Sequence, residues 1–389
     1  MLQSILVNLF ANRRQPPYSK LSEITDPEQF LWRILPHAAR TFSFSIIFLP
    51  RRMRKALAVA YLYCRMLDTY EDLLPGVPAK ENALKRFIQR LAAGSQPEAA
   101  PALDPSLTND PRERTHLLLV NRADLIDRIF MQLSDMHQKA ICRLVQRMGK
   151  GMIWSSRVFA DQNGVLQSPG QLSRYCWHVL GTPILFAEEM QRLDRGLDYR
   201  VDDARLRSCA IVGEVIQLAN ITRDMERDYE RGIFYHPDLP GLHGLRREEC
   251  IREVRSQLVL RALRLAVEFQ PFVNAISTPP VSLARGAAIL LVITTIAYYI
   301  RAAKNAGMPA FHHHERITRF GGTLTWLKCI FSRKATSDYL RSVDETVRTA
   351  FARCRPDPSR RFVYEDKEFD VVQVVDSAPP TLSTSAIES

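Results

Sequence analysis

The chain has 389 residues, of which 46% are hydrophobic and 24% are charged; this is ordinary for a globular protein and disfavours a wholly disordered or wholly membrane-embedded chain. Lys and Arg number 53 against 42 Asp and Glu, and the net charge of +11 favours anionic partners such as diphosphates or acidic lipid surfaces, although a solvated basic surface explains it equally well. The basic residues are spread along the chain without a nucleic-acid-binding module, so we expect no nucleic acid partner.

Cysteine usage and glycine motifs exclude further classes. Seven cysteines, an odd number without a Cys-x-x-Cys pair, favour a reducing compartment and therefore a cytoplasmic location, and they argue against a zinc site. No Gly-x-Gly-x-x-Gly motif occurs, so the sequence does not predict a Rossmann dinucleotide-binding domain.

Residues 1–26 are expected to form an N-terminal extension. Within residues 1–11, apolar side chains recur at helical spacing, and Arg13 and Arg14 follow them. Because the charges follow the apolar run and no small-residue cleavage site is evident, a secretory signal is not indicated. The two remaining interpretations are a short interfacial helix and a segment that packs against the domain or frays.

Residues 27–354 carry nearly continuous helical signals and predict one all-α domain. A long helix is expected over residues 51–73, because Pro75 and Pro78 end it. Residues 94–111 are rich in Gly and Pro and read as a loop. The composition does not change across this loop, so we place no domain boundary there.

The helix expected over residues 51–73 has a polar stripe with unusual surroundings. Tyr61, Arg65, Asp68 and Asp72 lie at i, i+4, i+7 and i+11 and therefore share one face. The residues beside that face are mostly apolar. Polar groups set among apolar ones favour a face that lines an internal cavity or a ligand site.

A second stripe of the same design lies in residues 213–237. Gly213, Gln217, Asn220, Asp224 and Asp228 share a helical face, and the other faces of the first half of this helix are apolar. Two solvated helix faces with i, i+4 ion pairs are the alternative, which the apolar flanks disfavour. Two such acidic ladders facing each other would repel unless cations sat between them, and ligands that are all oxygen suit Mg²⁺ together with substrate phosphates. The sequence therefore predicts a magnesium and diphosphate site.

The C-terminal third contributes a long apolar helix and a polar tail. The helix expected over residues 281–303 contains a 15-residue apolar run, which is short for a membrane span of roughly 20 residues, so we expect a buried core helix. Beyond residue 355 the chain turns polar and rich in Pro, Ser and Thr, which predicts a disordered tail over 355–389.

The two acidic motifs, Asp68-Thr-Tyr-Glu-Asp72 and Asn220-Ile-Thr-Arg-Asp-Met-Glu-Arg-Asp228, resemble those of the squalene and phytoene synthases, the head-to-head prenyl transferases. The resemblance runs from about Phe30 to about Arg319, and it includes Ala39-Arg-Thr-Phe-Ser43 and Tyr175-Cys-Trp-His178. It implies an isoprenoid-synthase-like helical bundle around a central cavity.

The resemblance also implies roles for individual residues. The expected metal ligands are Asp68, Glu71, Asp72, Asn220, Asp224 and Asp228. The expected catalytic residues are Tyr61, Tyr175, Arg65 and Arg223. The expected substrate-binding residues are Arg40, Phe42, Arg65, Gln217, Asn220, Arg223 and Gly213. An NADPH contact is expected near residues 311–322, at Arg316 and Arg319.

The activity that the resemblance implies is Mg²⁺-dependent condensation of two farnesyl diphosphates to presqualene diphosphate and, with NADPH, to squalene. Asp68-Thr-Tyr-Glu-Asp72 resembles the squalene form of the motif, and a bacterial-type squalene synthase is the expected relative. A phytoene synthase acting on geranylgeranyl diphosphate and a non-catalytic scaffold relative are the alternatives; the scaffold is disfavoured because all four principal aspartates are present. An apolar product and a basic surface are compatible with peripheral association with a membrane.

Three departures from the family pattern stand out. Arg227 occupies a position where the family usually has Glu, and Ile233 one where Arg is common. Leu180-Gly-Thr-Pro183 replaces a more Gly-rich kink, which leaves the shape of the prenyl pocket open.

Overall fold

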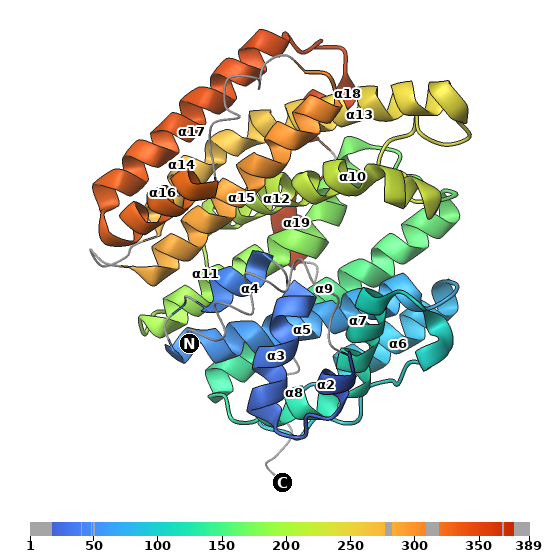
Figure 1. The fold of residues 1–389 in the computed structure, drawn as a ribbon, viewed down its shortest axis with the longest axis vertical. Coiled ribbons are helices and arrows are strands. Elements are labelled where there is room, and N and C mark those ends of the chain that lie inside the picture. The colour runs from blue at the N-terminus through green and yellow to red at the C-terminus, as the bar shows by residue number, and fades with distance from the viewer. Residues whose placement is uncertain are drawn as a thin grey trace.

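The computed structural model describes residues 18–39, 41–47, 49, 51–276, 282–308, 319–367 and 369–376. These residues fold into helices, and one isolated parallel β-bridge joins Val165 to Phe234 (Figure 1). The helices are α2 (Tyr18–Ser22), α3 (Pro27–Ala39), α4 (Thr41–Ile47), α5 (Arg51–Leu73), α6 (Val77–Gln89), η1 (Pro105–Leu107), α7 (Pro111–Asn121), α8 (Ala123–Phe130), α9 (Asp135–Asp161), α10 (Pro169–Cys176), η2 (Trp177–Gly181), α11 (Thr182–Asp194), α12 (Asp203–Glu230), α13 (Gly244–Leu265), η3 (Ala266–Glu268), α14 (Phe269–Ala275), α15 (Leu283–Asn305), α16 (Arg319–Phe331), α17 (Arg333–Cys354), α18 (Arg361–Tyr364) and α19 (Val371–Asp376).

Local sequence signals account for several helix boundaries. α5 spans the predicted residues 51–73, and the predicted loop over 94–111 contains only the short η1 before α7 begins at Pro111. Asp110 caps α7 by accepting hydrogen bonds from the backbone of its first turn, and Asp202 caps α12 in the same way. These caps fix the first residues of α7 and α12.

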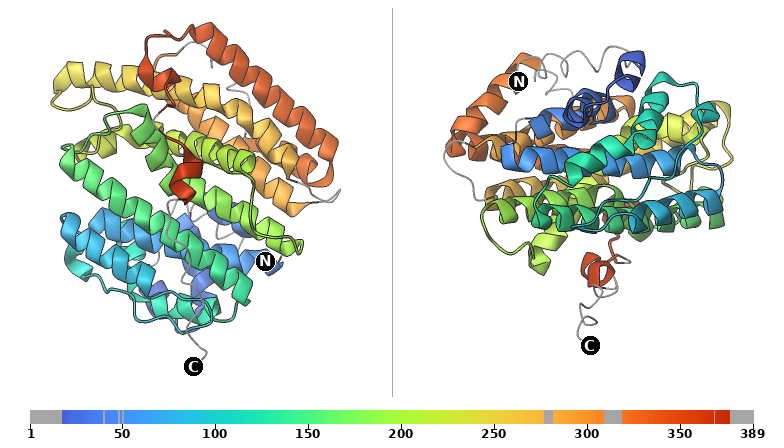
Figure 2. Two further views of the ribbon diagram at one scale, coloured as in Figure 1. Left: turned by 180° about the vertical axis from the view of Figure 1, so that it is seen from behind. Right: turned by 90° about the horizontal axis from the view of Figure 1, so that it is seen from below.

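Two apolar clusters make up the core. One is built from α3 and α5 to α9, in the lower half of Figure 1, and the other mainly from α10 to α18, in the upper half. α5 belongs to the first cluster and α12 to the second, and the left view in Figure 2 shows the same two halves from behind. The polar stripes of α5 and α12 therefore come from opposite halves of the core.

α15 is the predicted apolar helix of residues 281–303. Among the described helices it is the one long and apolar enough to cross a membrane by length and composition. In the fold, Ile289, Val292 and Ile296 are buried in the core, while Ala287 and Leu291 line the large cavity described below. Apolar surroundings on two sides therefore account for the composition of this helix.

The predicted disordered tail is wrong for much of residues 355–376. α17 ends at Cys354, and α18 then buries Phe362 and Val363 against the core. α19 packs on α12, and Figure 2 shows this C-terminal helix lying against the body of the domain. The composition of this segment did not predict its structure, because a few buried apolar side chains and the hydrogen bonds from the buried Arg261 hold it on the core. Residues 377–389 lie outside the described residues, as do 1–17.

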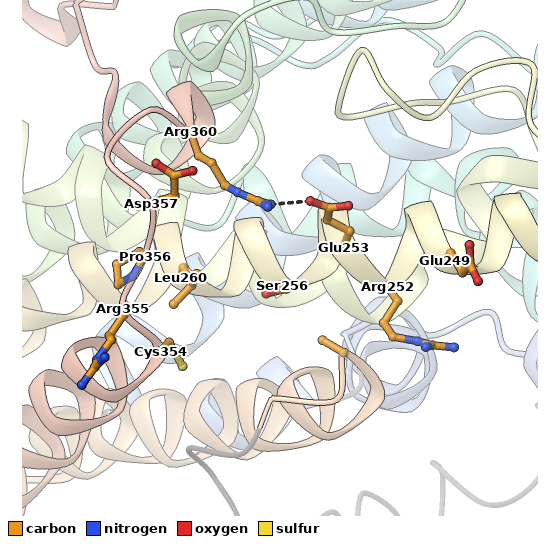
Figure 3. Close-up of a pocket in the computed structure, with 11 residues that line it drawn as sticks. Glu249, Arg252, Glu253, Ser256, Leu260, Cys354, Arg355, Pro356, Asp357 and Arg360 are labelled. Atoms are coloured by element: carbon orange, nitrogen blue, oxygen red, sulfur yellow. Dashed lines mark ion pairs between the residues drawn. The ribbon is translucent and has the colours of Figure 1, made fainter.

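A small cleft separates α13 from the connection between α17 and α18 (Figure 3). Its volume is about 430 Å³, and Arg360 pairs with Glu253 across it at 2.6 Å. Its charged lining residues balance in sign: Glu249, Arg252, Glu253, Arg355, Asp357 and Arg360. Paired charges and few apolar side chains distinguish this cleft from the larger cavity.

Candidate active site

A cavity of about 1200 Å³ lies between α5 and α12. This exceeds the roughly 300–1000 Å³ of ordinary small-molecule sites. One part of its wall carries both acidic ladders, and the rest is largely apolar. The apolar wall includes Ile46, Leu49, Met53, Leu57, Phe186, Phe272, Ile276, Ala287 and Leu291. The cavity can therefore hold charged groups at one end and long apolar chains at the other.

The stripe on α5 faces this cavity as predicted: Tyr61, Arg65, Asp68, Glu71 and Asp72 all line it. Arg65 connects the stripe, because its guanidinium lies 3.1 Å from the Asp68 carboxylate and donates a hydrogen bond of 3.2 Å to the Tyr61 hydroxyl. Burial raises the pKa of Asp68 to about 6, against the opposing effect of Arg65. The α5 carboxylates are thus in an environment that favours a bound cation.

Glu71 is the most strongly perturbed carboxyl group of the site. Its side chain accepts a hydrogen bond of 3.0 Å from the Ser155 hydroxyl of α9. Burial, followed by the negative charges of Asp72 and Asp68, raises the pKa of Glu71 to about 8. Ser155 was not among the predicted site residues, because its only sequence signal is a polar residue on a helix face that is otherwise apolar.

Replacing Glu71 with Gln is expected to flatten the dependence of stability on pH in the metal-free protein. The folded-state pKa of about 8 lies above the ordinary value of 4.5, so between these values the folded protein binds more protons than the unfolded chain. The contribution of Glu71 to the free energy of unfolding should therefore fall as pH rises from about 4.5 to about 8, and Glu71→Gln should remove this contribution. Urea unfolding in chelator at a series of pH values measures this slope, and equal slopes for wild type and Glu71→Gln would contradict the assignment.

The stripe on α12 lines the opposite wall with Gln217, Asn220, Asp224 and Asp228. The Asn220 amide donates a hydrogen bond of 3.1 Å to Gln217. Burial and the charge of Asp224 raise the pKa of Asp228 to about 6. Carboxylates from two separate helices therefore line one cavity.

Arg223 holds Asp224 on this wall. Its guanidinium forms a two-pronged contact with the Asp224 carboxylate, at 2.9 and 2.5 Å. It also lies over the Tyr298 ring of α15, 5.1 Å from the centroid. This planar cation is therefore placed at the cavity wall, where a diphosphate oxygen could replace the carboxylate as its partner.

A pair of tyrosines links the cavity to the second ladder. Tyr175 and Tyr235 both line the cavity, and their rings lie 5.6 Å apart. Tyr235 in turn donates a hydrogen bond of 3.2 Å to the Asp228 carboxylate. Tyr235 was missed from the sequence, although it lies only seven residues beyond Asp228, because nothing in the helical pattern shows that the loop after α12 folds back.

Two arginines connect the mouth of the cavity to the first ladder. Arg231 lies 3.4 Å from Asp72 and 3.0 Å from Glu113, and Arg227 lies 3.2 Å from the same Glu113 oxygen. All four residues line the cavity. Arg231 and Glu113 were not predicted, since a contact between residues 118 positions apart leaves no local signal. Arg227, which departs from the family pattern, thus faces an acidic partner on α7.

One predicted substrate-binding residue does not line the cavity. Gly213 is on the expected face of α12, but it is absent from the cavity lining and meets the π-helical turn η2. A Cβ at Gly213 would lie 2.4 Å from the Cα of Gly181, so glycine is required here by the close approach of two backbones. The Leu180-Gly-Thr-Pro183 segment is the kink where this contact forms.

For four predicted residues the structure describes no side chain. Arg40 and Arg316 lie outside the described residues altogether. For Phe42 in α4 and Arg319 in α16 the backbone is described, whereas the side chains are not. Their assignment to substrate and NADPH remains a prediction.

The described oxygen ligands of this cavity fit Mg²⁺ that is bound together with substrate phosphates, and they do not form a site in which protein side chains alone hold the ion. Within the described ranges, no three His, Cys, Asp or Glu side chains are grouped closely enough to hold an ion by themselves. Mg²⁺ usually keeps several waters and binds through one or two carboxylates plus substrate phosphates. The raised pKa values of Asp68 and Asp228, one on each wall, also indicate a cation site. A bound cation would stabilise the charged form of these buried carboxyl groups and reduce the repulsion from neighbouring aspartates.

The profile of the squalene/phytoene synthase family matches residues 35–320, well over half of the chain. The chain belongs to this family. Both ladders and the tyrosine pair lie inside the matched region. Members of the squalene/phytoene synthase family are prenyl transferases, and the chemistry of prenyl transfer can therefore be compared with this cavity.

Individual relatives of the family are distant. A squalene synthase of Schizosaccharomyces pombe is 23% identical over 231 residues, covering 57% of this chain and 46% of that protein. A lycopaoctaene synthase of Botryococcus braunii is 29% identical over 214 residues, covering 54% and 44%. The matches thus span less than half the length of these curated relatives.

Solved structures show the same fold. TcSQS in complex with the ligand BPH1237 superposes with a TM-score of 0.64 at 20% identity, covering 87% of this chain and 94% of that chain. TcSQS with the ligand E5700 gives a TM-score of 0.63 at 21% identity, covering 91% and 97%. The predicted all-α isoprenoid-synthase-like domain is confirmed.

Proposed function

We propose that this member of the squalene/phytoene synthase family condenses two farnesyl diphosphates head to head to presqualene diphosphate in a Mg²⁺-dependent reaction and, with NADPH, forms squalene. The observation that carries the proposal is the pair of acidic ladders on facing walls of one large, otherwise apolar cavity. The form of Asp68-Thr-Tyr-Glu-Asp72 and the squalene synthases among the relatives support the farnesyl substrate over geranylgeranyl diphosphate.

The first step is binding of the diphosphates at the acidic end. The carboxylates of Asp68, Asp72, Asp224 and Asp228 would hold Mg²⁺, which when bound offsets the charge of the departing diphosphate. The guanidiniums of Arg65 and Arg223 already lie against these carboxylates and can shift to phosphate oxygens. Gln217 and Asn220 supply amide groups on the same wall.

The apolar end protects the allylic cation that forms when diphosphate departs. Side chains such as Phe186, Phe272 and Leu291 offer no nucleophile and exclude water, which would otherwise quench the cation to an alcohol. The second prenyl chain must lie along the same wall, so its double bond is the nearest electron donor. The cavity volume supports two chains in one site.

The tyrosine pair provides a route for the proton lost as the cyclopropane closes. Tyr175 and Tyr235 both line the cavity, and the Tyr235 hydroxyl donates a hydrogen bond to the Asp228 carboxylate. A proton taken up at the Tyr175 hydroxyl can leave through Tyr235 towards the carboxylate. Tyr61, held by Arg65 on the other wall, is the second candidate for this role.

Replacing Arg231 with Met is expected to weaken binding of inorganic diphosphate about tenfold in the presence of Mg²⁺. The pairs of Arg231 with Asp72 and Glu113 are partly exposed, and exposed pairs contribute only about 0–1 kcal/mol, so a diphosphate can readily displace them. A charge-assisted hydrogen bond contributes about 1.5–3 kcal/mol. Calorimetric titration measures the affinity.

Arg348→Met is the matched control for Arg231→Met, because Arg348 is an exposed arginine paired with Asp344 on α17, away from the cavity lining. It should bind diphosphate as the wild type does. Equal affinities for both variants would remove Arg231 from the site.

Product analysis with purified protein and Mg²⁺ tests the function. We expect presqualene diphosphate from farnesyl diphosphate alone. We expect squalene only when NADPH is added. Phytoene from geranylgeranyl diphosphate without a farnesyl product would establish the alternative substrate. No product from either substrate would favour a non-catalytic scaffold.

A further inference from the structure

Exposed apolar side chains gather at one place on the surface. Of the seven large hydrophobic residues that are exposed in the described part of the chain, four come from the start of α15 and from α16. They are Leu283, Leu324, Leu327 and Phe331, with exposed fractions of 36%, 45%, 41% and 64%. We call these four residues the α16 patch. The other three exposed residues come from α9, the loop before α12 and α13.

The α16 patch is a defined face. Leu324, Leu327 and Phe331 lie at i, i+3 and i+7, so they point to one side of α16. The opposite side is anchored in the core through Cys329 and Ile330, which are buried. α16 therefore has large apolar side chains both on the face that packs on the core and on the face that is exposed to solvent.

Hydrogen bonds lock this helix onto α15. The backbone N–H of Ser282 donates to the Ile330 carbonyl at 3.0 Å, and the Trp326 indole donates to the Gly286 carbonyl at 3.0 Å. The buried Arg285 guanidinium donates to the carbonyls of Cys329 and Ile330, both at 2.8 Å. Leu283 and Phe331 are thus held next to these contacts, and the exposure of the patch is a property of the packed helix pair.

Basic residues surround the patch. Lys328 lies one turn from Leu324 on the same face, and Arg333 and Lys334 are exposed immediately after Phe331. Residues 319–337 contain no Asp or Glu, and Asp338 is the next acidic residue along the chain. Large apolar groups with lysine and arginine beside them are the composition of a helix that lies in the interface of an anionic membrane.

One residue of the patch, Leu283, begins the helix that lines the apolar end of the cavity. Ala284, Ala287 and Ala288, on α15, line that cavity, while Leu283 begins the same helix on the surface. Figure 1 shows α15 and α16 together at the edge of the molecule, beside α17. An apolar product formed in the cavity would therefore lie against the same helix that begins at this surface, and this step of the argument rests on the proposed function.

We propose that the α16 patch docks the protein on the surface of an anionic lipid bilayer, with Leu324, Leu327 and Phe331 inserted among the acyl chains and Lys328, Arg333 and Lys334 against the headgroups. Docking is peripheral, since the patch belongs to a packed helix pair. A second copy of the chain would have to bring acidic groups to match the basic rim, whereas an anionic headgroup layer supplies them everywhere.

Vesicle flotation of the full chain, without substrate or metal, tests the docking separately from catalysis. The wild type should float with vesicles containing phosphatidylglycerol, should stay with the soluble fraction when vesicles are pure phosphatidylcholine, and should be released by high salt. The double variant Leu327→Ser/Phe331→Ser should lower partitioning about tenfold or more, as expected for the loss of two inserted apolar side chains. Circular dichroism confirms its fold.

Leu245→Ser is the matched control, because Leu245 is the most exposed of the seven residues at 77% and lies on α13. This variant should float like the wild type. Equal flotation of the double variant and Leu245→Ser, or no flotation of the wild type, would overturn the proposal. So would a wild-type dimer in solution that the double variant dissolves, or loss of flotation only when residues 1–17 are deleted. A protein that floats with the vesicles but makes no product would contradict the proposed function and leave the docking proposal standing.

Discussion

Asp68→Asn and Asp224→Asn, one on each wall of the cavity, are each expected to lower turnover by about 10²–10³-fold or more, the loss typical of removing one group that stabilises developing charge. Asn keeps the shape of the side chain and removes the charge that a cation requires. Both residues line the cavity, and each pairs with an arginine, Arg65 or Arg223. The measurement is steady-state product formation from farnesyl diphosphate.

A second readout separates loss of ligand binding from loss of chemistry. Mg²⁺ plus inorganic diphosphate should raise the melting temperature of the wild type, because ligands that bind the folded state stabilise it. Both variants should lose most of this shift. Asp203→Asn, at an exposed position in the first turn of the same α12, is the control that should keep both activity and shift. Full activity in both ladder variants would show that the carboxylates do not act on a cation.

The ladders were predictable because they are local. Asp68 and Asp72 share a face of α5 through helical spacing alone, and so do Asp224 and Asp228 on α12. Apolar neighbours around both stripes indicated an enclosed site. Of the twelve predicted residues that are fully described, eleven line the cavity, and Gly213 does not. Sequence spacing is sufficient for this prediction because the period of a helix determines which side chains point to the same face.

Contacts between distant segments were not predictable. Gly213 fits the stripe on α12, yet its face is taken by the backbone of η2, which is 32 residues earlier in the chain at Gly181. Arg231 reaches Asp72 and Glu113 because two helices of different core clusters meet at the mouth. The spacing within one helix says which residues share a face; which neighbour covers that face depends on the packing of the whole domain.

Replacing Arg261 with Met is expected to lower the free energy of unfolding by about 3–5 kcal/mol, the range for breaking a buried ion pair from one side. The Arg261 side chain is fully buried and lies 2.6 Å from Glu214, whose side chain is 8% exposed. It also donates to Ser173 and to the backbone carbonyls of Phe362 and Glu365. Without the guanidinium, Glu214 stays buried without its cation, and α18 loses its hydrogen bonds to Arg261. Urea unfolding measures the change, and proteolysis near α18 should become faster.

Arg264→Met is the matched control, because Arg264 pairs with the same Asp366 that Arg261 contacts, at 2.6 Å, but lies partly exposed. It should cost less than about 1 kcal/mol, as exposed pairs do. Adding Glu214→Met to Arg261→Met should recover much of the lost stability, since replacing both partners by apolar groups of similar size removes the unpaired charge. If both arginine variants lost the same small amount, the C-terminal segment would be held by Phe362 and Val363 alone, and order beyond residue 355 would owe nothing to the buried charge.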